Sequence, residues 1–237
     1  MKIVVTGHKG YIGREVLFLL HMMGYKPAGI DLESGGDVAN GLPKSDVVIH
    51  LATKWSGPGY IRYNTDITQI ALKNTNKIVF ASSSHVYGEV RLASEDFKLD
   101  PVTKYGKGKK LCEKLILRSG IAYSILRLSN VYSLHDTHGI VGQFLKGDRT
   151  IHGTGSKIRD FVRLEDIVPV IVEAAISERW NDIYNLSTGS GISTKELFNR
   201  ILPGAEAEYV PSPEKELKRC VAANGKARMN GFITMSL

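Results

Sequence analysis

The chain of 237 residues contains only two cysteines, Cys112 and Cys220, and their spacing matches no metal or redox motif. It has no apolar run approaching the roughly 18 residues that a membrane-spanning helix requires. Its N-terminus leads directly into a predicted strand and shows no signal-peptide pattern. The sequence therefore predicts a cytoplasmic protein with reduced thiols, no metal site and no membrane anchor.

Basic side chains outnumber acidic ones, and the formal net charge is +7. This balance favours an anionic ligand. No stretch interleaves basic residues with stacking aromatic ones, so nucleic-acid binding is not predicted. One local concentration of charge is expected to form the solvated face of a helix. It comprises Lys104, Lys107, Lys109, Lys110 and Lys114.

Short apolar runs alternate with amphipathic stretches over the first 132 residues. Uniformly apolar strands between helices are typical of a parallel sheet that is covered on both faces. The sequence thus predicts an α/β fold with a Rossmann-type, doubly wound parallel sheet. The predicted strands are 2–6, 26–30, 47–51, 78–81 and 123–128, and the predicted helices are 11–23, 60–76 and 103–119.

A glycine-rich turn, Gly7-His8-Lys9-Gly10-Tyr11-Ile12-Gly13, joins the first predicted strand to the first helix. Glycines there let the backbone approach a pyrophosphate at the helix N-terminus. Asp31 ends the second strand, where a carboxylate binds the adenosine ribose and repels a 2′-phosphate. Together they predict that the chain binds NAD rather than NADP. The alternative is that the glycines form an ordinary tight turn and that Asp31 caps the end of a strand. Asp37-Val38 and Leu51-Ala52 are placed to flank the two ends of the cofactor, although Asp37 also suits a turn.

The pattern changes after residue 132. A polar loop is expected at 135–142, then a helix at 165–177, a strand at 183–186 and a helix at 193–202. Ser193 and Glu196 form a capping-box pattern at the start of the last helix. We expect residues 1–132 to form an NAD-binding domain to which 160–187 return. The small substrate-binding part would then comprise 133–159 and 188–237.

Tyr105 and Lys109 are four residues apart and so share one helix face. A free phenol, with a pKa of about 10, is a poor base at neutral pH, but a neighbouring cation favours the phenolate. With a hydroxyl from another segment and a hydride acceptor, the pair could oxidise an alcohol. A Tyr-x-x-x-Lys spacing also arises by chance on exposed helices. The functional interpretation of the pair therefore depends on the rest of the sequence.

That context resembles the extended short-chain dehydrogenase/reductases, and more narrowly the NAD-dependent epimerase/dehydratase family acting on nucleotide sugars. The resemblance rests on the glycine turn, on Asp31 and on Tyr105-x-x-x-Lys109. It extends to His-Leu-Ala (50–52), Ser-Ser-Ser-His-Val-Tyr-Gly (82–88), Leu-Arg-Leu-Ser-Asn-Val-Tyr (126–132), Gly-Thr-Gly (153–155) and Arg-Asp-Phe-Val (159–162).

The resemblance implies roles for individual residues. Tyr105 would be the catalytic base, Lys109 its pKa modulator and a ribose ligand, and Ser83 the catalytic hydroxyl. The implied substrate is a nucleotide-diphosphate sugar, held by Ser83, Ser84, Asn130 and Arg159, although Arg159 also suits a surface salt bridge. The implied cofactor-binding residues are Gly7, Gly10, Tyr11, Ile12, Gly13, Asp31, Asp37, Val38, Leu51, Ala52, Tyr105 and Lys109.

Three departures from the family pattern refine the expected function. Ser84-His85 replaces the Asp-Glu pair that the dehydratase branch uses, so elimination of water is not expected. The helix around Asn64 is shorter than usual, which leaves a homodimer open. The chain ends at Leu237, which predicts a reduced substrate-binding part. The favoured reading is a sugar epimerase. The alternatives are a nucleotide 4-keto-sugar reductase consuming NAD(P)H, and a non-catalytic NAD-binding regulatory module.

Overall fold

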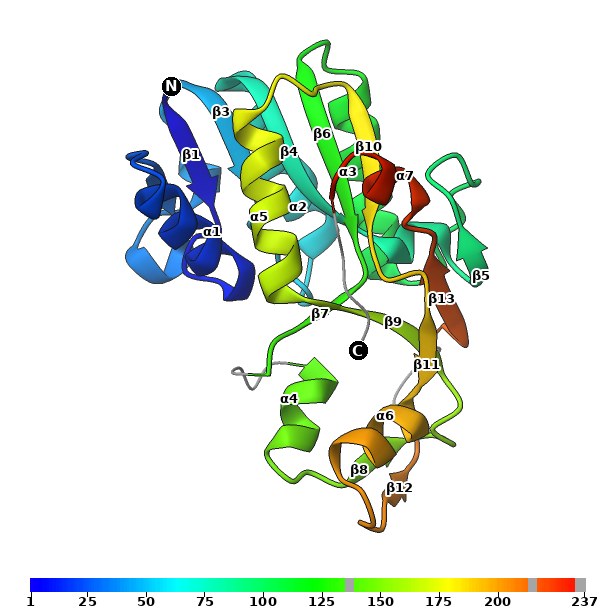
Figure 1. The fold of residues 1–237 in the computed structure, drawn as a ribbon. Helices are drawn as coiled ribbons and strands as arrows, with labels where there is room; N and C mark the ends of the chain where they lie inside the picture. Colours follow the sequence, from blue (N-terminus) through cyan, green and yellow to red (C-terminus); the bar gives the residue numbers. More distant parts are fainter. Residues whose placement is uncertain (135–138, 213–216, 233–237) are drawn as a thin grey trace.

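Six parallel strands form the central sheet of the computed structural model, which describes residues 1–134, 139–212 and 217–232 (Figure 1). The strand order is β10-β6-β4-β3-β1-β2, which confirms the predicted α/β fold. The order changes direction between β1 and β3, and ligands of such sheets bind at this switch point. The strands are β1 (Ile3–Thr6), β2 (Ala28–Ile30), β3 (Ser45–His50), β4 (Thr75–Ser83), β6 (Ala122–Leu128) and β10 (Asp182–Leu186).

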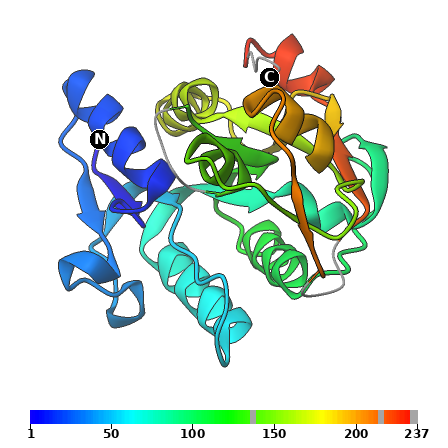
Figure 2. The same cartoon turned by 90° about the horizontal axis from the view of Figure 1, so that it is seen from below.

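Two pairs of helices cover the two faces of this sheet (Figure 2). Because side chains alternate along a strand, Ile3 and Val5 of β1 pack against α1 (Tyr11–Met22) and α5 (Leu164–Ile176). Val4 faces the other way, into the cluster formed with α2 (Tyr60–Lys73) and α3 (Lys104–Leu117). Burial on both faces explains why the strands are apolar throughout.

Helix boundaries follow the local signals in the sequence. Gly24 follows α1 with a φ of +83°, a conformation that favours glycine. Thr103 caps α3, its hydroxyl accepting from the Gly106 N–H at 3.0 Å. Ser193 caps α6 (Thr194–Ile201) and accepts from the Glu196 N–H at 3.1 Å, as the capping-box pattern predicts.

A smaller lobe lies below the sheet in Figure 1 and packs its own aromatic cluster, including Phe144 and Phe198. It contains α4 (Gly139–Leu145), α6, β8 (Thr150–His152) and β12 (Glu208–Val210). The loop predicted at 135–142 is therefore wrong over 139–142, which begin α4, while 135–138 lie outside the described residues.

A second sheet, in the order β11-β9-β13-β5 with β7 paired to β9, connects this lobe to the central sheet (Figure 1). Its strands are β5 (Val90–Ala93), β7 (Asn130–Tyr132), β9 (Ile158–Arg163), β11 (Gly191–Ser193) and β13 (Arg219–Ala222). The remaining elements are α7 (Gly225–Met229) and the 3₁₀ helices η1 (Leu32–Ser34), η2 (Val38–Asn40) and η3 (Ser84–Tyr87). Within the described part of the chain, no helix is both long and apolar enough to cross a membrane.

Candidate active site

A cavity of about 1010 Å³ opens at the switch point of the central sheet. This volume lies at the upper end of the range for ligand pockets. The structure brings most of the predicted site residues to its wall, but Asp37 and Ser84 do not line it. Those that do are Gly7, Gly10, Tyr11, Ile12, Gly13, Asp31, Val38, Leu51, Ala52, Ser83, Tyr105, Lys109, Asn130 and Arg159.

The glycine turn makes a close-packed cradle that admits no side chain. Gly7 has a φ of +71°, and a Cβ there would lie 2.7 Å from the Ala52 amide nitrogen. A Cβ on Gly13 would lie 2.0 Å from the Gly7 carbonyl oxygen. The start of α1 therefore lies directly against the turn after β1, with its N-terminus at the cavity, which suits a pyrophosphate.

Asp31 and Asp37 differ in where they lie. Asp31 lines the cavity at the end of β2 and accepts from the backbone N–H groups of Lys9 and Glu33, both at 3.0 Å. A carboxylate has about four lone-pair sites, so Asp31 retains acceptors for a ribose. Asp37 instead accepts from the Ala39 N–H at 2.9 Å and the Tyr63 hydroxyl at 2.6 Å. Its carboxylate thus caps η2, and a contact between Asp37 and the cofactor stays a prediction.

Ser83, Tyr105 and Lys109 meet at one end of the cavity. Ser83 ends β4, and its hydroxyl lies close enough to the phenol of Tyr105 on α3 to favour the phenolate. Lys109 is one helical turn further along, only 6% exposed, and its ammonium donates to the Ala81 carbonyl at 2.7 Å. The ammonium lies 5.8 Å from the centroid of the Tyr105 ring. A hydroxyl, a phenol and a buried cation are thus assembled from two elements.

The protonation equilibria of the pair differ from the expectation that Lys109 lowers the pKa of Tyr105. Burial raises the pKa of Tyr105 above that of a free phenol, and the hydrogen bond with Ser83 only partly opposes this. Burial lowers the pKa of Lys109 to about 8. The prediction of a lowered phenol pKa is wrong, because desolvation of the buried phenol is the largest influence on it.

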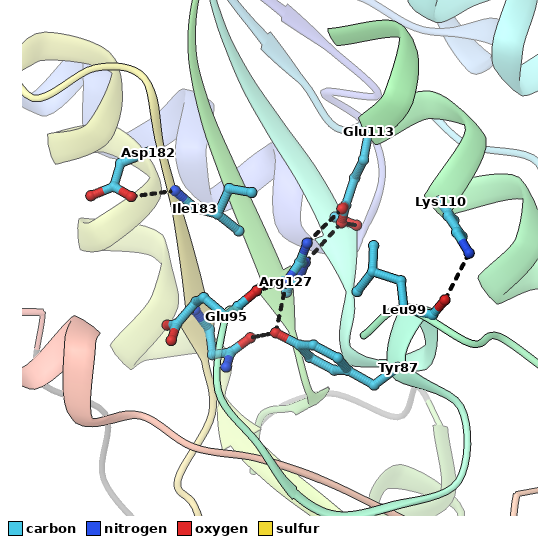
Figure 3. Close-up of polar contacts among 10 residues, drawn as sticks. Tyr87, Glu95, Leu99, Lys110, Glu113, Arg127, Asp182 and Ile183 are labelled. Atoms are coloured by element: carbon cyan, nitrogen blue, oxygen red, sulfur yellow. Dashed lines mark hydrogen bonds and ion pairs between the residues drawn. The ribbon is translucent and has the colours of Figure 1, made fainter. Parts of the chain in front are cut away.

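A buried ion pair fixes α3 against the strands beneath it (Figure 3). Arg127 of β6 donates to both carboxylate oxygens of Glu113, with Nε at 3.1 Å and NH2 at 2.8 Å. Its NH1 group donates to the Tyr87 hydroxyl at 2.8 Å. Glu113 also accepts from Ser82 at 2.5 Å. Ser82 precedes Ser83, and Glu113 follows Lys109 by one turn. This network therefore holds the end of β4, which carries Ser83, against α3, which carries Lys109.

Ser84 lies outside the cavity. It is 3% exposed, begins η3, and its carbonyl accepts from the Cys220 thiol at 3.4 Å. A contact between Ser84 and the substrate stays a prediction, which the lining of the cavity does not support. Asn130 and Arg159 do line the cavity, together with Lys157. Arg159 is braced by the carbonyls of Ile158 and Leu217, at 2.9 and 2.6 Å, which orients a guanidinium suited to phosphate.

Several cavity residues were not predicted. Trp55 stacks on Tyr105, with ring centroids 4.7 Å apart, and His85 meets the same ring edge-on at 5.8 Å. Among the described residues, the buried hydroxyls of Thr53 and Ser129 have no hydrogen-bond partner, and both line the cavity. Such orphaned groups point to a polar ligand. Ser129 stands within the Leu-Arg-Leu-Ser-Asn-Val-Tyr motif, whereas no spacing in the sequence marks Thr53 or Trp55.

Comparison with known proteins decides the family. The model of the NAD dependent epimerase/dehydratase family matches residues 3–187. The chain belongs to that family. Membership makes it an enzyme whose cofactor is NAD. The glycine cradle, Asp31 and the unpartnered hydroxyls fit that cofactor.

Relatives of the epimerase/dehydratase family resemble the chain over nearly its whole length. A putative UDP-glucose 4-epimerase of Methanocaldococcus jannaschii is 30% identical over 97% of this chain and 92% of the relative. The crystal structure of the Thermotoga maritima UDP-glucose 4-epimerase with UDP-glucose has a TM-score of 0.84 at 25% identity, covering 97% of this chain and 92% of that one. The UDP-glucose 4-epimerase of Thermus thermophilus, in complex with NAD, has a TM-score of 0.80 at 25% identity, covering 98% and 94%.

Proposed function

We propose that the chain is a nucleotide-diphosphate-sugar epimerase that inverts a hydroxyl-bearing carbon of the sugar. One observation carries the proposal. Ser83, Tyr105 and Lys109 face the same cavity as the glycine cradle and as Asn130 and Arg159. A redox site and a diphosphate-binding site would therefore share one cavity. The UDP-glucose 4-epimerases among the relatives support epimerisation at carbon 4 of the sugar.

The residues divide the work by position. The Ser83 hydroxyl orients the reacting sugar hydroxyl against the Tyr105 phenol. Tyr105 takes the hydroxyl proton as the sugar is oxidised and gives it back when the sugar is reduced on its other face. Arg159 and Asn130 hold the diphosphate and sugar in the cavity that they share with Tyr105. Ser83 thus orients the sugar hydroxyl, Tyr105 transfers its proton, and the other residues bind the substrate.

The chemistry that bound NAD would supply is the acceptance and return of the hydride, with a positively charged ring in the cavity. A positive charge favours the phenolate form of Tyr105, which burial alone disfavours. Lys109 contributes a second cation, held on the Ala81 carbonyl. Asp31 would hold the adenosine ribose, and Gly7, Gly10 and Gly13 the pyrophosphate. The protein thus supplies position and charge around chemistry that belongs to the cofactor.

The test combines cofactor analysis with a substrate panel. Purified protein is denatured and any released NAD is identified, while the native protein is incubated with nucleotide sugars and no added cofactor. We expect stoichiometric bound NAD and interconversion of an epimer pair such as UDP-glucose and UDP-galactose. Stoichiometric loss of added NADH with a 4-keto sugar would instead identify a reductase. Bound NAD with no turnover of any nucleotide sugar would identify a regulatory module.

A further inference from the structure

Trp55 lies in the segment between β3 and α2 and lines the cavity. Its ring stacks on the Tyr105 ring with an interplanar angle of 20° and centroids 4.7 Å apart. The residue nevertheless remains 67% exposed. One face of the indole is therefore occupied by the phenol while much of the remaining surface is open to the cavity and solvent.

The position of Trp55 is fixed by the residue before it. The buried Asn64 side chain of α2 clamps the backbone of Lys54 from both sides. Its Oδ1 accepts from the Lys54 N–H at 2.8 Å, and its Nδ2 donates to the Lys54 carbonyl at 2.8 Å. The Lys54 ammonium also lies 3.8 Å from the centroid of the Tyr63 ring on α2. The backbone that carries the indole is thus held to a packed helix through Lys54.

Leaving an indole exposed is unfavourable, because a large aromatic side chain gains much free energy from burial. Exposed apolar surface that lines a cavity marks a surface that a ligand covers. The identity of the ligand group follows from Tyr105. The part of the substrate that is oxidised must lie at the phenol, and in a nucleotide sugar that part is the sugar ring. A pyranose ring presents C–H groups on its faces and so offers an apolar surface to the indole.

We propose that Trp55 is a substrate-binding residue that packs on the sugar ring and positions it at the Tyr105 hydroxyl. The proposal rests on the proposed function, since it takes the reacting group to be a sugar. The diphosphate is assigned to Arg159 and Asn130, which lie on β9 and β7 and not in the segment that carries Trp55. Trp55 therefore contributes to affinity for the nucleotide sugar but not to affinity for the nucleoside diphosphate alone.

Calorimetric titration tests this difference with two probe pairs, UDP-glucose with UDP and GDP-mannose with GDP. Trp55→Ala should raise the Kd of the nucleotide sugar on the order of tenfold, the loss expected for one aromatic contact, and leave the Kd of the matching diphosphate unchanged. Trp55→Phe should restore most of the affinity. Equal losses for both members of a pair, or no loss for the sugar, would overturn the proposal.

A fluorescence titration provides a second readout that needs no change at Trp55. The chain has two tryptophans, so Trp180→Phe leaves Trp55 as the only indole. The nucleotide sugar should change the emission of Trp55, and the diphosphate should not. If neither sugar probe binds or changes the emission, the proposal is wrong. Selective binding without turnover would support Trp55 as the sugar contact while refuting the proposed epimerisation, so the two failures are distinguishable.

Discussion

Replacing Arg127 by methionine removes the cation from the buried pair between β6 and α3. The Arg127 side chain is 3% exposed and that of Glu113 is 1% exposed, so water does not reach Glu113 to replace the lost guanidinium. Of the contacts made by the carboxylate, the hydrogen bond from Ser82 would remain. Leaving one charge of a buried pair without its partner costs about 3–5 kcal/mol. In a chain of this size, that loss lowers the Tm by roughly 6–20 °C.

Thermal and urea unfolding of Arg127→Met measures this cost. The matched control is Arg200→Met, because Arg200 and Glu196 form an ion pair with the same 2.8 Å separation but with side chains 49% and 51% exposed. The control should lose at most about 1 kcal/mol, since exposed pairs contribute little.

A double variant separates the stranded charge from the lost packing. Arg127→Met in a Glu113→Gln background leaves no charge without a partner, so it should cost less than Arg127→Met in the native chain. If Arg127→Met and Arg200→Met destabilised the protein equally, the burial argument would be refuted. The same conclusion would follow if the Glu113→Gln background made no difference.

Three further predictions concern His50, Gly13 and Asp31. Burial, and then the charge of Lys109, lowers the pKa of His50 to about 3, so stability present above pH 6.5 is lost as the pH falls. Between pH 6.5 and 4.5, the free energy of unfolding of the native protein should therefore fall by about 2–3 kcal/mol more than that of His50→Gln. Urea unfolding measures both, and the same pH dependence for the two proteins would contradict this prediction. Gly13→Ala should abolish retention of NAD, because its Cβ meets the Gly7 carbonyl oxygen, whereas Gly225→Ala, with open space around it, should retain the cofactor. Asp31→Ser should reduce the ratio of NAD to NADP affinity at least about tenfold in direct titration, and an unchanged ratio would remove Asp31 from the ribose site.

The central sheet and the glycine cradle could be predicted because their signals are local. Apolar runs at Ile3–Thr6 and at 78–81 read as buried strands, and the glycine turn follows the first of them directly. The second sheet could not be predicted in this way. Its strands have three to six residues and pair across long separations, as Cys220 does with Val90. No local pattern reports such partners.

Site residues were predicted where a motif fixes the backbone, and missed where orientation or solvation decides. Asp37 follows a plausible pattern, but its carboxylate caps η2. Ser84 adjoins Ser83, yet it begins η3 and lies beside β13. The raised pKa of Tyr105 depends on burial, which a spacing of Tyr and Lys does not reveal. Trp55 reaches Tyr105 from a segment that Asn64 holds by two hydrogen bonds to the preceding residue, and no local pattern predicts that contact.

Turnover of Tyr105→Phe, with NAD content and nucleotide-sugar affinity measured on the same preparation, tests the catalytic assignment of Ser83, Tyr105 and Lys109 directly. Tyr209→Phe is the control, because Tyr209 is 50% exposed on β12 and does not line the cavity. We predict that Tyr105→Phe retains NAD and binds the nucleotide sugar but loses roughly 10²–10⁴-fold in kcat, the usual contribution of a positioned acid–base group. Turnover within a few-fold of the control, with NAD still bound, would contradict the assignment.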